Sequence, residues 1–284
     1  DACDVYFKRS YASVAIAGLQ GGREKVHPFG LNYFVLPDFL DRLAVCRAVR
    51  LPGPPSGRTY ALREALDASN RLGFRPRVRD LESTSLDPLS PRVLFLVTAY
   101  DPHDNAGRSA EKIAEREEGN EMRARCIRLL RKELGAAFLG GFNHSKFTVE
   151  RYPDCLVTDS AITDKARYVG IMKTFPICIA TTGLHRSIGW KLAEYVAASR
   201  AIVSEPLCYD VPGAFAAGTN YLEFRTADQC VEQALALMAD PADNRGLAEW
   251  AEQVGASERT LARLFKSELD TSFGAWRQQL RLAK

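Results

Sequence analysis

The chain has 284 residues, of which 46% are apolar and 26% are charged. These ordinary values predict a folded protein of about two domains and exclude a disordered chain, a collagen-like repeat and a disulfide-dense miniature. The formal net charge of +3 is too small to indicate a nucleic-acid partner by itself. No apolar run approaches the ~20 residues that a membrane span needs, and no signal peptide is visible. The first residue is Asp1 rather than Met, which indicates a start after processing or inside a longer gene product.

The seven cysteines are odd in number, widely scattered and never arranged as a CxxC pair. Most of them stand among apolar neighbours, so we expect small buried hydrophobic side chains in a reducing compartment. No pair of cysteines has the spacing of zinc ligands. The sequence therefore favours a cytoplasmic protein without a structural metal.

Three regions differ in pattern. Residues 1–90 are irregular, with a Pro/Gly-rich linker at 51–57 and one clear helix at about 58–70. Residues 91–240 alternate strand-like and helix-like segments, which is typical of βαβ units around a parallel sheet. Residues 241–284 are helical with short turns. We therefore expect an α/β fold with a Rossmann-like parallel sheet, followed by a small all-α helix-turn-helix segment.

Within the middle region, strands are expected at 92–98, 136–142, 155–158, 177–181, 201–204 and 221–224. Four helices separate or follow them. Asn120 is expected to cap the first, which runs to Leu134, and Thr163 the second. The third runs from about Trp190 to Ala198, and Thr226 caps the last.

The most informative stretch is 181–195, which joins a buried strand to a helix. Loops of this kind bring backbone N–H groups and a helix dipole to an anion. Two glycines allow close approach of the backbone, a serine offers a hydroxyl, and an arginine and a lysine supply positive charge. The candidate ligand-binding residues are Gly183, His185, Arg186, Ser187, Gly189, Lys191 and Glu194. The structural alternatives are a common glycine-bearing βα loop, a hydrogen-bonded His185, and a Glu194 that only favours the positive helix end.

Residues 183–205, with 211–215 and 220–224, resemble the nucleotide-binding half of GT-B glycosyltransferases. The resemblance covers about 92–240 and makes 1–91 a remnant of the acceptor-side domain. It implies a nucleotide-sugar donor, with the diphosphate on the loop, the ribose on Glu194, and Arg186 and Lys191 neutralising the leaving group. It implies no resident cofactor, and because no Asp-x-Asp pair is present we expect no metal. Retaining members often have a second glutamate where this chain has Arg186, so the stereochemical outcome and the catalytic residues stay open.

The C-terminal region shows a second pattern. A helix at 247–254 has one apolar face, and Ser257 is placed to cap a following helix at 258–269. The second helix carries Arg259, Arg263 and Lys266 on the side opposite its apolar residues. Such a helix can enter the major groove of DNA. The alternative is an amphipathic three-helix cap on the α/β domain with a solvated basic face.

Residues 256–266 and 271–281 closely resemble the first helix-turn-helix of AraC-family transcription regulators. The resemblance implies binding of double-stranded DNA through 247–284, with contacts from Ser257, Arg259, Arg263 and Lys266. The family's second motif has no counterpart before Lys284. Three functions therefore compete: glycosyl transfer from a nucleotide sugar to an unknown acceptor, sequence-specific DNA binding, and an inactive fusion of two truncated genes.

Overall fold

A computed structural model describes residues 4–19, 21–35, 76–83, 91–239 and 257–269. The helices predicted at 58–70 and 247–254, and the linker at 51–57, lie outside these residues. The middle region forms a five-stranded sheet in which every pairing is parallel and the order is β4-β3-β5-β6-β7. The strands are β3 (Val93–Val97), β4 (Phe138–Phe142), β5 (Ile177–Ala180), β6 (Ala201–Ser204) and β7 (Leu222–Glu223). The predicted α/β fold with a parallel sheet is confirmed.

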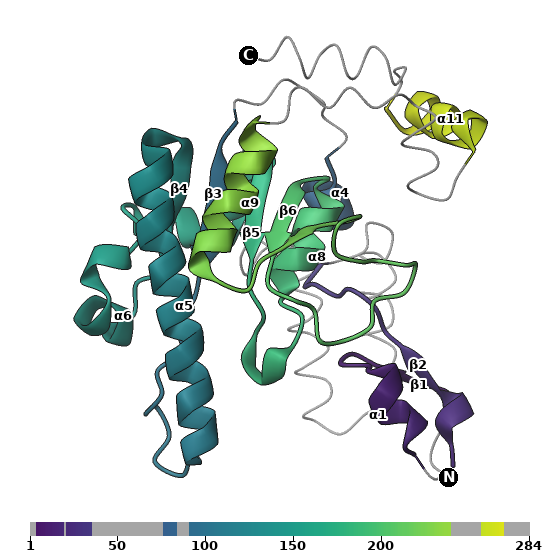
Figure 1. Cartoon of the computed structure of the whole chain (residues 1–284), viewed down its shortest axis with the longest axis horizontal. Helices are drawn as coiled ribbons and strands as arrows, with labels where there is room; N and C mark the ends of the chain where they lie inside the picture. Colours follow the sequence, from purple (N-terminus) through teal and green to yellow (C-terminus); the bar gives the residue numbers. More distant parts are fainter. Residues whose placement is uncertain (1–3, 20, 36–75, 84–90, 240–256, 270–284) are drawn as a thin grey trace, which may run out of the picture.

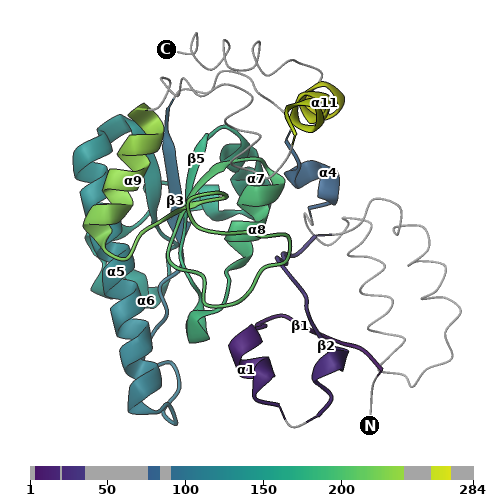
Figure 2. The ribbon, with the colours of Figure 1, turned by 45° about the vertical axis from the view of Figure 1, so that its right-hand side comes forward.

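The sheet lies between two layers of helices, as Figures 1 and 2 show. Every residue of β3 is buried, because alternate side chains enter different cores. Val93, Phe95 and Val97 pack with α5 (Ala110–Leu134) and α9 (Ala227–Ala239). Leu94 and Leu96 pack with α7 (Lys165–Lys173) and α8 (Trp190–Ala197). The strand predicted from this continuous apolar run is therefore buried on both faces, as expected.

The chain reverses the direction in which the sheet grows at β3. From β3 it passes through α5 to β4 on one side, and it then returns through α6 (Lys146–Arg151) and α7 to β5 on the other side. The helices that follow β3 and β5, α5 and α8, consequently lie on opposite faces of the sheet. In open α/β sheets, ligands bind at such a switch point, in the crevice outside the carboxyl ends of the two strands.

Two predicted helix starts and one predicted strand are wrong. Helix α5 begins at Ala110, and Asn120 lies buried within it, where its side chain accepts from the Tyr100 N–H (2.9 Å) and donates to the Tyr100 carbonyl (2.7 Å). Helix α7 is capped by Asp164, whose carboxylate accepts from two backbone N–H groups, while the Thr163 hydroxyl donates to the Ser160 carbonyl. The strand expected at 155–158 is a single bridge between Phe142 and Leu156.

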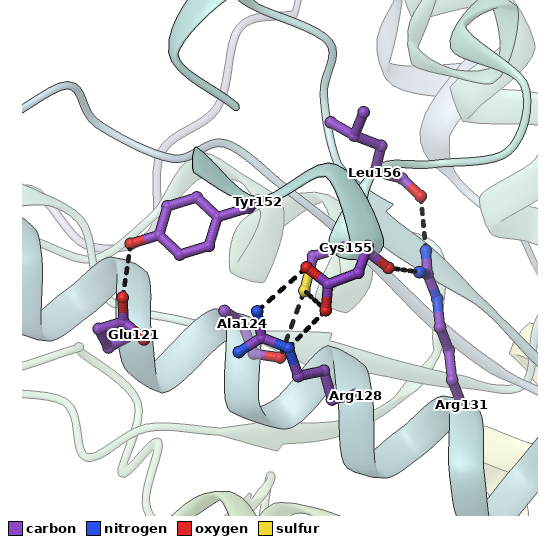
Figure 3. Close-up of polar contacts among 8 residues, drawn as sticks. Glu121, Ala124, Arg128, Arg131, Tyr152, Cys155 and Leu156 are labelled. Carbon is purple, nitrogen blue, oxygen red and sulfur yellow. Dashed lines mark hydrogen bonds and ion pairs between the residues drawn. The ribbon is translucent and has the colours of Figure 1, made fainter. Parts of the chain in front are cut away.

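Ionic and hydrogen-bonding contacts hold the turn after α6 against α5 (Figure 3). Arg128 donates to both carboxylate oxygens of Asp154, at 2.6 and 3.1 Å. Arg131 donates to the carbonyls of Asp154, Gly140 (2.9 Å) and Leu156 (2.6 Å), which joins this turn to β4. The guanidinium of Arg128 lowers the pKa of Asp154 to about 2. These contacts fix the path by which the chain returns from β4 towards α7.

Four of the five cysteines that the structure describes as free are buried, as the sequence predicts. They are Cys126, Cys155, Cys178 and Cys230. Burial raises the pKa of the Cys155 thiol to about 11, which keeps that thiol protonated near neutral pH. Among the described helices, none has the length and apolar character needed to cross a membrane.

The N-terminal segment forms a parallel pair of short strands, β1 (Tyr6–Lys8) and β2 (Val26–Pro28), with the helix α1 (Ser13–Ala17) between them. Its contact with the α/β unit includes the Ser13 N–H, which donates to Asp210 at 2.7 Å. The side chains of Leu31, Tyr33 and Val35 pack on the core beneath α7 and α8, together with Leu81 of α4 (Val78–Leu81). This segment therefore borders the side of the sheet on which α8 lies (Figure 2).

Candidate functional site

A cleft of about 350 Å³ opens at the carboxyl ends of β3 and β5. The two strands pair only through Val93–Ile177 and Leu94–Cys178, and beyond that point Phe95, Val97 and Ile179 line the cleft. The polar lining includes Thr98, Asn143, Thr163, Thr181 and Thr182. The cleft therefore occupies the crevice that the strand order creates.

The side chain of Arg123 bridges the two strand ends. This arginine projects from α5 and is 5% exposed. Its guanidinium donates to the carbonyls of Thr98 (2.8 Å) and Thr182 (2.7 Å) and to the Thr181 hydroxyl (3.2 Å). Burial lowers its pKa, but an arginine stays charged near neutral pH. Because its hydrogen-bond partners are neutral, Arg123 brings a positive charge to the cleft, and the nearby carboxylate of Glu205 favours that charge.

Two lysines and a glutamate converge on the other wall. Glu194 of α8 is 2% exposed and forms an ion pair with Lys165, at the start of α7. The ammonium of Lys191 lies 3.9 Å from the ring centroid of Tyr168, and that of Lys165 lies 5.0 Å from the same centroid. Burial, and then the nearby Lys165 charge, lower the pKa of Lys191 to about 8, while Glu194 opposes the shift.

The charges of the cleft favour an anion. Arg123, Lys165 and Lys191 line it, against the single carboxylate of Glu194. The N-terminus of α8 opens at Gly189, which contributes no side-chain cap, so the positive end of the helix dipole adds to the field. Excess positive charge at a helix N-terminus is the usual environment of a bound phosphate group.

The structure brings four of the predicted ligand-binding residues into the cleft: Gly183, Gly189, Lys191 and Glu194. His185, Arg186 and Ser187 lie outside its lining. His185 and Arg186 have positive φ values of 58° and 53° and exposed side chains. Glu115 accepts from the His185 N–H at 2.5 Å, and the Tyr209 hydroxyl donates to the His185 carbonyl at 2.9 Å. The left-handed turn therefore directs both basic side chains away from the cleft.

One backbone N–H group of the loop at 183–187 is engaged within the loop itself. The Gly183 N–H donates to the Ser187 carbonyl at 2.7 Å, which closes the turn. A Cβ at Gly183 would lie 2.8 Å from the Ser187 hydroxyl oxygen. A side chain at Gly183 would require the Ser187 hydroxyl to move. The cleft's basic charge comes from side chains on α5, α7 and α8.

Sequence reasoning missed Arg123, Lys165 and Tyr168. Arg123 carries the clearest signal, because it shares a helix face with the buried residues Asn120, Ile127 and Leu130. A charged side chain on a face that is otherwise buried is rare unless it is paired. Lys165 lies at the start of α7, between β4 and β5. No sequence pattern around it indicates contact with Glu194.

In the C-terminal part, the structure describes α11 (Glu258–Leu269) with Ser257 before it. The Ser257 hydroxyl oxygen accepts from the Thr260 N–H at 3.1 Å, as its predicted capping role requires. Arg259, Arg263 and Lys266 are exposed and recur at the spacing of one helix face. DNA binding by this face stays a prediction, since the helix expected to support it lies outside the described residues.

No family model, curated protein or solved structure matches this chain. Within the described ranges, no group of three or more His, Cys, Asp or Glu side chains is placed to hold a metal ion.

Proposed function

We propose that the cleft binds the nucleoside diphosphate part of a nucleotide-sugar donor, and that the protein is a glycosyltransferase with a Rossmann-like, GT-B type donor domain. One observation supports this most: three cations and a helix N-terminus surround a cleft at the switch point of a parallel sheet. The acceptor is unknown.

Each side chain in the cleft has a part in this proposal. Lys165 and Lys191 neutralise the diphosphate and the charge that develops on it as the sugar leaves. Glu194, which forms an ion pair with Lys165, accepts hydrogen bonds from the ribose hydroxyls. Trp190 is 46% exposed at the cleft and offers aromatic surface to the base. Phe34 stacks on its ring at 6.4 Å between centroids, and the Arg9 guanidinium lies 5.9 Å from the same ring. Arg186 has no part, in contrast to the expectation from the sequence.

The test is thermal unfolding of the full chain with uridine and adenosine diphosphates. A ligand at a hundred times its Kd stabilises the folded state by about 2.7 kcal/mol, which corresponds to a rise in Tm of roughly 5–10 °C for a domain of this size. Glu194→Gln and Lys191→Met should lose most of the rise. The matched control is Arg186→Met, which removes a basic side chain of the same loop outside the cleft and should keep it.

Two results would contradict the proposal. An equal loss of the shift in Arg186→Met and Lys191→Met would place the anion on the exposed loop. A full shift with inorganic diphosphate, and none added by the nucleoside, would reduce the site to a general anion site. Release of nucleoside diphosphate from a panel of nucleotide sugars then tests the transfer step itself.

A further inference from the structure

The ammonium groups of Lys165 and Lys191 lie over the same aromatic ring but have different partners. Lys165 has the buried carboxylate of Glu194. Lys191 has the face of Tyr168 at 3.9 Å and, among the described residues, no ion pair. Lys191 is half-buried and lines the cleft.

These surroundings disfavour the charged form of Lys191. The Tyr168 ring removes water from one side of the ammonium, and Lys165 repels it. The other titratable groups that face it are Glu194 on its own helix, which favours the charge, and the buried thiol of Cys178 on β5. With a pKa of about 8, about a quarter of the amine is neutral at pH ~7.5, against about one in a thousand for an ordinary lysine.

We propose that Lys191 is a nucleophilic amine that condenses with a phosphorylated aldehyde or ketone in this cleft, forming an imine. The neutral nitrogen attacks the carbonyl carbon, a C–N bond forms, and the carbonyl oxygen takes up the amine proton. The resulting carbinolamine loses its hydroxyl group as water after a second protonation. The Lys165–Glu194 pair is placed to supply that proton and take it back. The remaining positive charge of the cleft attracts the phosphate group.

The probe is pyridoxal phosphate at limiting concentration, with borohydride reduction of the imine and mass-spectrometric assignment of the modified lysines in the full chain. Lys191 should be modified at least about tenfold faster than Lys132, because a lowered pKa exposes free amine. Lys132 is an exposed lysine paired with Glu133 at 3.0 Å, and it is the internal control. Pyridoxal without the phosphate should react about tenfold more slowly at Lys191 and equally at Lys132.

The pH profile distinguishes a perturbed amine from an accessible one. The rate at Lys191 should rise with a midpoint near pH 8, since the reactive form is the deprotonated one. Lys165→Met removes the repelling charge and leaves Glu194 to Lys191, so the midpoint should move up. Lys191→Arg should abolish the fast modification and Lys132→Arg should keep it. If Lys165→Met does not fold, the pH profile of labelling in the wild type and the loss of fast labelling in Lys191→Arg still test the proposal.

Labelling of Lys191 no faster than that of Lys132, or a midpoint of about pH 10, would overturn this inference. It does not rest on the proposed function, because the labelling needs no nucleotide. A chain that binds no nucleoside diphosphate but reacts at Lys191 would refute the donor site and leave the amine chemistry standing. Protection of Lys191 by uridine diphosphate would place both ligands in the same cleft.

Discussion

Replacing Arg123 by methionine tests whether this side chain holds the cleft together. Methionine keeps much of the apolar stem but removes three hydrogen bonds, to the carbonyls of Thr98 and Thr182 and to the Thr181 hydroxyl. The two carbonyls follow strands that no longer pair with each other beyond Leu94. Without the guanidinium, they lose the donor that joins them.

The expected cost follows from those contacts. A fully buried acceptor that loses its partner costs about 1–3 kcal/mol. The two carbonyls that lose one here are part-buried, so the loss should be about 2–4 kcal/mol. Arg125→Met is the matched control two residues along the same helix. Arg125 pairs with Asp228 at 2.7 Å, but both side chains are 66% exposed, and exposed pairs contribute about 0–1 kcal/mol.

Urea unfolding followed by far-ultraviolet circular dichroism measures both variants. Arg123→Met should lower the free energy of unfolding by about 2–4 kcal/mol and also abolish the nucleotide-induced rise in Tm, because the loops after β3 and β5 separate. A difference between the two variants of less than about 1 kcal/mol would refute the reasoning. Full nucleotide binding by a folded Arg123→Met would also show that the guanidinium does not shape the cleft.

Two further predictions concern the supporting structure. Arg128 lowers the pKa of Asp154 to about 2. The pair therefore contributes stability at pH values above the unfolded pKa near 4 and loses it as the pH falls towards 2. The difference in Tm between wild type and Asp154→Asn should shrink over that pH range, and a constant difference would contradict this prediction. Gly140→Ala would place a Cβ 2.5 Å from the Phe95 carbonyl oxygen and should cost about 1–3 kcal/mol in urea unfolding. A Cβ at Gly170 meets nothing within 4 Å, so Gly170→Ala should stabilise α7 by about 0.5–1 kcal/mol. If both substitutions change the free energy of unfolding in the same direction, the steric argument is refuted.

Strand β3 could be predicted because burial on both faces leaves an unambiguous apolar run at 93–97. The start of α5 could not be predicted in the same way. Its first turns, from Ala110 to Gly119, contain mostly charged and small residues without an apolar face, and Figure 1 shows this end of the helix extending beyond the sheet. Asn120 has the chemistry of a cap, but its amide is used by the backbone of Tyr100. The capping chemistry of Asn120 therefore led to a predicted helix start at that residue, ten residues after the actual start of α5 at Ala110.

The glycine loop could be recognised from the sequence, but the direction of its side chains could not. Gly189, Lys191 and Glu194 follow helical spacing, which places Lys191 and Glu194 on one side of α8, and both line the cleft. The left-handed backbone at His185 and Arg186 has no such periodicity. It turns the arginine outward, and the cation that replaces it, Lys165, comes from a different crossover.

The same feature of the topology accounts for both the cleft and its charge. Because β3 and β5 lead to helices on opposite faces, their ends separate, and the carbonyls after them have no neighbouring strand to donate to them. The carbonyls of Thr98 and Thr182 are part-buried at the cleft. Such groups usually have a hydrogen-bond donor, and a guanidinium on the facing helix supplies several at once. The donor that satisfies the split in the sheet is itself a cation, so the position at which this fold opens is also the position at which it becomes electropositive. An anionic ligand is the partner that such a crevice favours.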